Sequence, residues 1–133
     1  MMDDQAFLKA FEDASLSPSE FSHRGHIRMA WLYLRAYGWD EGMVHIRSGI
    51  QTFAAHLGAT TKYHETMTVF WARVVQHMLQ EQPQIDSFDD FLAYFPQILD
   101  THLIEHHYNR ELLRSPLARQ QWVEPDLVLM PAL

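Results

Sequence analysis

Three histidines begin two apolar stripes of the chain, and their types and spacing are suited to metal binding. His23 and His26 lie three residues apart at the start of the stretch FSHRGHIRMAWLYL. At about 3.6 residues per turn they share a helix face with Ile27 and Trp31, which is the face that a helix buries. His64 begins a second stripe in the same way, in the stretch YHETMTVFW. The pattern therefore predicts that three imidazoles lie at the edge of the hydrophobic core, where two buried helix faces begin.

Imidazoles in an apolar pocket lose their hydration, at a cost on the order of a few kcal/mol each if nothing replaces it. A divalent cation binds neutral imidazoles and satisfies their lone pairs. Three histidine ligands also leave a coordination position for water or substrate, as in catalytic metal sites. The sequence thus predicts that His23, His26 and His64 bind zinc, iron, nickel or copper at one end of a helical bundle. The alternative is that the rings are hydrogen-bonded to carbonyl or carboxylate oxygens.

The neighbours of these histidines supply candidate catalytic and substrate-binding groups. We expect Glu65 to act as a general base or to orient a metal ligand, with Tyr63 beside it as a second catalytic residue. An arginine near a metal can hold a carboxylate or phosphate of a small substrate. The predicted substrate contacts are Arg24, Thr68 and Tyr108. A further ligand is possible from the stretch DTHLIEHHYNREL, where spacing does not choose among His102, His106 and His107.

The elements that must position these residues are predicted to be helices. Apolar residues recur with the helical period, the chain has only five glycines, and no alternation of strand length is bounded by turn residues. We predict an all-α, single-domain helical bundle of about five to six helices over residues 1–133. The expected helices are 4–13, 22–37, 40–58, 60–80, a segment between Pro83 and Pro96, 101–113, and a short turn capped by Ser115. The end of the chain, WVEPDLVLMPAL, is expected to be extended.

Composition restricts the partners that the protein can have. The 133 residues include 17 acidic and 10 basic side chains, for a formal charge of −7, which disfavours nucleic acid. There is no cysteine, so disulfides and thiolate ligands are excluded. No apolar run has the length of a membrane span, and the acidic start does not resemble a secretory signal. We expect a cytoplasmic protein with a small-molecule ligand or substrate; its oligomeric state is left open.

Several familiar metal signatures are missing. The HExxH motif of zinc peptidases does not occur, and neither does a His-Asp dipeptide. Di-iron bundle proteins use two Glu-x-x-His pairs, but only Glu20 and His23 form such a pair here.

The stretches FSHRGHIRMAWLYL, YHETMT and ARQQWVEPDL together resemble a family of short bacterial proteins of uncharacterised activity. That family has Phe-x-His-x-x-His, then Ala-Trp-x-x-Leu, Tyr-His-Glu-Thr and Trp-x-x-Pro-Asp-Leu, over about residues 20 to 128 here. The positions that match its pattern are Phe21, His23, His26, Ala30, Trp31, Tyr63, His64, Glu65, Thr66, Trp122, Pro125 and Asp126. His107 and Tyr108 stand where two aromatic residues are expected. The resemblance implies that these residues matter and implies no activity.

Three functions are consistent with the sequence. The first is a small metal-dependent enzyme, a hydrolase or an oxygen-dependent enzyme, that acts on a small polar molecule. The alternative is a non-catalytic helical module that binds a small ligand or a partner and whose pocket histidines are hydrogen-bonded. A metal-binding accessory protein is a third possibility.

Overall fold

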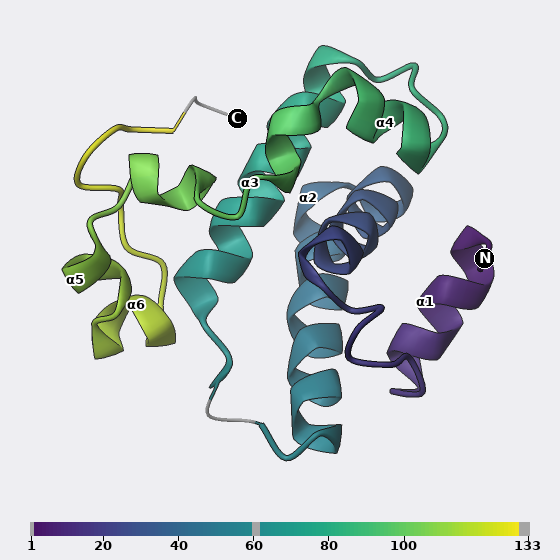
Figure 1. Cartoon of the computed structure of the whole chain (residues 1–133), viewed down its shortest axis with the longest axis horizontal. Coiled ribbons are helices and arrows are strands. Elements are labelled where there is room, and N and C mark those ends of the chain that lie inside the picture. The colour runs from purple at the N-terminus through teal and green to yellow at the C-terminus, as the bar shows by residue number, and fades with distance from the viewer. Residues whose placement is uncertain (1, 60–61, 131–133) are drawn as a thin grey trace. The chain divides into compact units, whose positions relative to one another are not determined.

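The computed structural model describes residues 2–59 and 62–130, and within these ranges the chain forms six α-helices and no strand (Figure 1). The all-α prediction and the expected number of helices are confirmed. The chain divides into two compact units, unit 1 (Met1–Tyr63) and unit 2 (His64–Leu133). That residues 1–133 form a single domain stays a prediction. No helix in the described ranges combines the length and apolar character needed to cross a bilayer.

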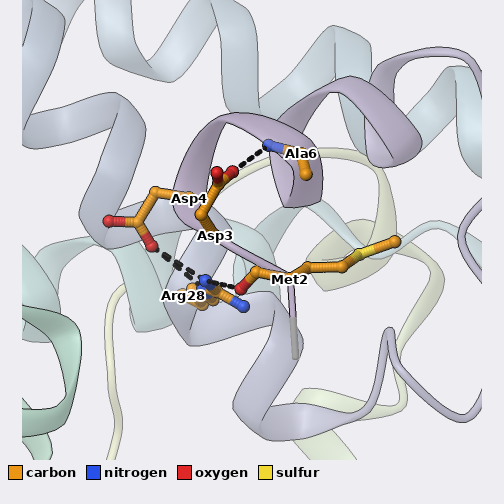
Figure 2. A network of polar contacts seen from close by, with 5 residues as sticks. All are labelled: Met2, Asp3, Asp4, Ala6 and Arg28. Atoms are coloured by element: carbon orange, nitrogen blue, oxygen red, sulfur yellow. Dashed lines mark hydrogen bonds and ion pairs between the residues drawn. The ribbon is translucent and has the colours of Figure 1, made fainter.

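Unit 1 begins with α1 (Asp4–Glu12), which starts where Asp3 caps it. The Asp3 carboxylate accepts a hydrogen bond of 2.7 Å from the amide of Ala6 (Figure 2). Arg28, on the next helix, donates to the Asp4 carboxylate at 2.9 Å and to the Met2 carbonyl at 3.0 Å (Figure 2). These contacts attach the start of α1 to the helix that follows it, and they give Arg28 a structural role.

The long helix α2 (His23–His56) contains a break at Gly38 (Figure 1). Gly38 has φ 78° and ψ −171°, a conformation that side chains with a Cβ rarely adopt. The two halves of α2 approach closely beside this break, since a Cβ added at Gly42 would lie 3.2 Å from the Tyr33 carbonyl oxygen. The prediction that a helix ends at Gly38 and another begins near residue 40 is confirmed in this form.

Aromatic side chains fill the core of unit 1. Phe11 of α1 is 1% exposed, and its ring centroid lies 4.8 Å from that of Phe21 and 5.8 Å from that of Phe53. Phe21 lies two residues before the start of α2 and Phe53 lies near its end, so this cluster joins both ends of α2 to α1. Burial of each such ring contributes on the order of 2 to 3 kcal/mol.

Unit 2 begins with α3 (Glu65–Glu81), where His64 is the capping residue. The sequence placed this start at residues 60 or 61, which lie outside the described residues. Next come α4 (Phe88–Tyr94), capped by Ser87 as predicted, and the short 3-10 helix η2 (Pro96–Leu99).

The prediction of a continuous helix over residues 101–113 was wrong. This stretch forms a 3-10 helix, η3 (Leu103–His106), and then a single turn, α5 (Arg110–Leu113). Asn109 separates them with an extended backbone, and its side chain accepts a hydrogen bond of 2.9 Å from the amide of Leu112. The Asp126 carboxylate accepts from the amide of Asn109 at 2.9 Å and fixes the break. Ser115 caps α6 (Pro116–Gln120), as predicted.

The described part of the tail, residues 121–130, is non-helical and is bound to the rest of unit 2 by hydrogen bonds. Thr66 of α3 donates to the Gln121 carbonyl at 2.8 Å and accepts from the amide of Val123 at 3.2 Å. Further along, the amide of Leu127 donates to the His107 carbonyl at 2.9 Å. The extended tail predicted from the sequence is therefore part of the packing of unit 2.

Candidate functional site

His64 uses both ring nitrogens to join two segments of unit 2. Nδ1 accepts a hydrogen bond of 3.1 Å from the amide of Met67, so the imidazole caps the first turn of α3. Nε2 lies 2.7 Å from the carbonyl oxygen of Leu113, at the end of α5, and must donate to it. The residue is only 8% exposed. The arrangement fixes one neutral tautomer, with the proton on Nε2.

The surroundings of His64 keep its ring uncharged. Burial lowers the pKa of this histidine below its ordinary value, and the positive charge of Arg119 lowers it further, against the hydrogen bond to Leu113. The neutral ring is also the form that binds metal. A metal at either nitrogen would, however, have to replace a hydrogen bond that the ring makes in this structure.

His26 lies in the first turn of α2, partly buried, with its ring stacked on Phe21 at a centroid distance of 3.7 Å. Its Nδ1 donates to the Ser22 carbonyl at 2.9 Å, which leaves the lone pair on Nε2. Burial lowers the pKa of His26, and the nearby His23 contributes in the same direction. These two histidines are thus neighbours, as their spacing predicted.

The three predicted ligands belong to different units, since His23 and His26 are in unit 1 and His64 is in unit 2. Within residues 2–59 and 62–130, no group of three or more His, Asp or Glu side chains is arranged to hold a metal ion. The metal site of His23, His26 and His64 stays a prediction.

Two of the predicted substrate contacts have hydroxyls that bind the protein itself. The Thr68 hydroxyl donates to the His64 carbonyl at 2.9 Å, within the first turn of α3. Tyr108 is 1% exposed and donates to the Val123 carbonyl at 2.6 Å. Burial raises the pKa of Tyr108, so this hydroxyl stays protonated and holds the tail.

The remaining predicted catalytic and substrate residues flank the two helix starts. Tyr63, the last residue of unit 1, and Glu65, the first of α3, are both partly buried. Arg24 is exposed and lines an open pocket of about 280 Å³ in unit 1, together with Glu20 and Arg28. His23 and His26 are not among the residues that line this pocket.

The three histidines left open by the sequence have different surroundings. His102 is exposed and pairs through Nδ1 with the carboxylate of Glu105. His106 is exposed on η3. His107 donates from Nδ1 to the Val128 carbonyl at 2.7 Å and so helps to hold the tail.

An open pocket of about 390 Å³ lies in unit 2, beside the segment that His64 supports. We call it the unit 2 pocket. It is lined by Met67, Thr101, His102, Ile104, Glu105, Arg110, Leu113 and Arg114. Leu113, whose carbonyl accepts from His64, is therefore a wall residue, and Met67, whose amide donates to His64, is another. The histidine predicted as a metal ligand thus ties together two walls of a pocket.

The sequence did not indicate Arg110 and Arg114 as pocket residues. A continuous helix would have placed Glu105 and Arg110 five residues apart on different faces. The break at Asn109 brings Arg110 Nε to 2.8 Å from the Glu105 carboxylate. One feature of the sequence could have indicated a new helix start here. Asn109 is a residue type that caps helices well, and it precedes the apolar pair of the stretch NRELL.

Stability is expected to fall as the pH falls below about 6.5, the ordinary pKa of histidine. Burial lowers the pKa values of His26 and His64 in the folded state, so the unfolded chain binds protons that the folded chain does not. The loss begins at the ordinary pKa and ends below the lowered ones. Exposed His102 acts in the opposite sense, because the hydrogen bond to Glu105 raises its pKa.

Urea unfolding at a series of pH values from about 7 to 5 measures this effect. His64→Asn should make the dependence shallower, because it removes one of these two histidines whose pKa is lowered. Stability that is constant or increases over this range would contradict the prediction.

Comparison with known proteins gives no assignment: no protein-family model, no curated protein and no solved structure matches the chain.

Proposed function

We propose that the chain is a non-catalytic helical module that binds a small molecule in the unit 2 pocket. The observation that carries this proposal is the engagement of both His64 ring nitrogens, with the Met67 amide and the Leu113 carbonyl. Both partners belong to residues that line the pocket. His64 then supports the binding site through its hydrogen bonds and binds no metal. This is the role that the alternative hypothesis from the sequence gave to the pocket histidines.

The pocket has the mixed lining that small-molecule sites use. Ile104 and Leu113 are buried and offer apolar surface, while Thr101 and two arginines offer polar groups at the rim. Small-molecule sites combine apolar surface with polar groups that fix the orientation of the ligand. The volume of about 390 Å³ is near the lower end of their usual range of roughly 300 to 1,000 Å³.

A test is an amide-resolved NMR titration of metal-free protein with a panel of neutral, cationic and anionic small molecules. The proposal expects at least one class to cause saturable shifts at amides of the pocket wall, such as those of Thr101, Ile104 and Leu113. Binding that requires added metal, or that moves only amides elsewhere, would overturn it.

The metal-dependent enzyme is the second candidate, and the pair in unit 1 supports it. His26 is neutral and carries its lone pair on Nε2, and His23 lies beside it. Such a pair can contribute two ligands to a divalent ion. In that case His64, as the third ligand, would give up one of its hydrogen bonds, and Glu65 would act as the base.

Metal analysis of protein purified without a histidine tag separates the two candidates. The binding module predicts substoichiometric metal and a melting temperature that zinc or iron does not change. The enzyme predicts stoichiometric metal that is lost in His23→Ala, a variant in which the His64 hydrogen bonds are intact. Stoichiometric metal that His23→Ala retains would contradict the predicted site.

A further inference from the structure

The unit 2 pocket is positively charged on a protein that is otherwise acidic. Its lining contains two arginines, Arg110 and Arg114, and one carboxylate, Glu105, so the formal charge is +1 (two minus one) when His102 is neutral. The whole chain carries −7. A local charge opposite to that of the surrounding surface concentrates ligands of negative charge.

The carboxylate in this pocket is already neutralised. One oxygen of Glu105 accepts from Arg110 Nε at 2.8 Å, and the other pairs with His102. These two contacts lower the pKa of Glu105, so it stays ionised and keeps both partners in place. Glu105 therefore holds Arg110 at the rim and does not leave an uncompensated negative charge facing a ligand.

Arg114 is the group that remains available to a ligand. Its side chain is exposed, and it forms no ion pair or hydrogen bond with the part of the chain that the structure describes. A guanidinium binds a carboxylate through two parallel N–H···O bonds. The pocket lining also contains three apolar side chains: Ile104 and Leu113 are 5% and 6% exposed, and Met67 is an exposed, flexible thioether.

We propose that the unit 2 pocket binds a small organic monocarboxylate, with Arg114 at its carboxylate and Ile104, Leu113 and Met67 against its apolar body. This inference rests on the proposed function and names its ligand class. A monoanion matches a site with one unengaged guanidinium and a formal charge of +1. A phosphate, with two charges, would bring a second negative charge that the formal charge of +1 does not offset.

The experiment titrates the full chain with benzoate, and with benzyl alcohol as the uncharged probe of similar shape, observed at the backbone amides by NMR. Benzoate should cause saturable shifts at the pocket amides and bind more tightly than benzyl alcohol. Arg114→Gln should weaken benzoate binding about ten-fold or more, because it removes a charge-assisted pair of hydrogen bonds. Lys62→Gln is the matched control, since it removes one exposed positive charge in unit 1 and should leave the affinity unchanged.

The outcomes separate the ligand class from the proposed function. Equal binding of benzoate and benzyl alcohol, unaffected by Arg114→Gln, would overturn the inference and leave the binding module standing. Binding of other members of the panel to the pocket, with no binding of benzoate, would do the same. No shift of the pocket amides with any probe would overturn both. Unchanged amide spectra outside the pocket establish that Arg114→Gln is folded.

Discussion

His64→Ala is expected to lower the free energy of unfolding by about 3 kcal/mol, in protein from which all metal has been removed. The variant loses the cap on the Met67 amide, which is worth about 1 kcal/mol. It also leaves the Leu113 carbonyl, 2.7 Å from Nε2, without its donor, at about 1 to 3 kcal/mol. Urea unfolding in the presence of a chelator measures the change.

Two variants make this measurement specific. His64→Asn restores a side-chain oxygen of the kind that caps helices, so it should recover the capping part of the loss but not the link to Leu113. His106→Ala removes an exposed imidazole from η3 and should change stability by less than about 0.5 kcal/mol. If metal-free His64→Ala were as stable as the parent chain, and only the metal-loaded protein were destabilised, His64 would be a ligand and not a structural cap.

Three helix starts in this chain could be predicted because their signals are local. Asp3, Ser87 and Ser115 each accept a hydrogen bond from an amide three residues ahead, which is the geometry that makes these residue types good caps. Gly38 marks the break in α2 because its positive φ excludes most other residues. Such features depend on a few consecutive residues, so the sequence contains them.

The break within residues 101–113 could not be predicted in the same way, because it depends on a distant partner. Asn109 binds Asp126, which is 17 residues away along the chain. Without that contact, the apolar pattern of the stretch favours one continuous helix. A continuous helix would also have kept Arg110 away from Glu105, so the contact between these two pocket residues could not be predicted either.

In the candidate site too, features set by nearby residues could be predicted, and contacts between residues far apart in the sequence could not. The apolar faces that begin with the pair His23 and His26 and with His64 could be predicted from spacing. In the structure His64 is buried and the His26 ring is stacked on Phe21. What the rings bind could not be predicted, because Leu113 is 49 residues from His64. A buried histidine needs a partner, and the sequence alone does not distinguish a cation from a backbone carbonyl.

Hydrogen bonds in unit 2 connect the Tyr-His-Glu-Thr stretch with the Trp-x-x-Pro-Asp-Leu stretch, two of the motifs on which the family resemblance is based. The threonine of the Tyr-His-Glu-Thr stretch binds the backbone on both sides of Trp122, the first residue of the Trp-x-x-Pro-Asp-Leu stretch. Asp126, from that second stretch, binds Asn109. The two stretches thus form one connected structure that holds the tail and the break before α5. Membership of the family stays a prediction.

Thr66→Val is the variant that tests this connection, and it should lower the free energy of unfolding by about 2 kcal/mol. Thr66 is fully buried, and valine has nearly the same shape, so packing is retained. The loss is the hydroxyl alone, which donates to the Gln121 carbonyl and accepts from the amide of Val123. Both backbone groups lie near the surface, so water replaces part of what is lost, and the cost stays below that of two fully buried groups.

Hydrogen exchange identifies where the stability is lost. In Thr66→Val, the amides of residues 122–130 should exchange faster than those of α3, because the tail detaches before the rest of unit 2 unfolds. Thr66→Ser retains the hydroxyl and should keep the tail protected. Thr52→Val, at an exposed position of α2, is the control for introducing valine into a helix. Equal protection of the tail in Thr66→Val and the parent chain would show that this hydroxyl does not hold it.

A double-mutant cycle with Tyr108→Phe then determines whether the tail is held as one element. The Tyr108 hydroxyl donates to the Val123 carbonyl, and the Thr66 hydroxyl accepts from the amide of the same residue. If the tail detaches as a unit, the second substitution costs less once the first has released Val123, so the two losses should sum to more than the loss in the double variant. Additive losses would mean that the two hydroxyls hold the backbone of Val123 independently. The tail would then stay in place beside η3 when either contact is lost.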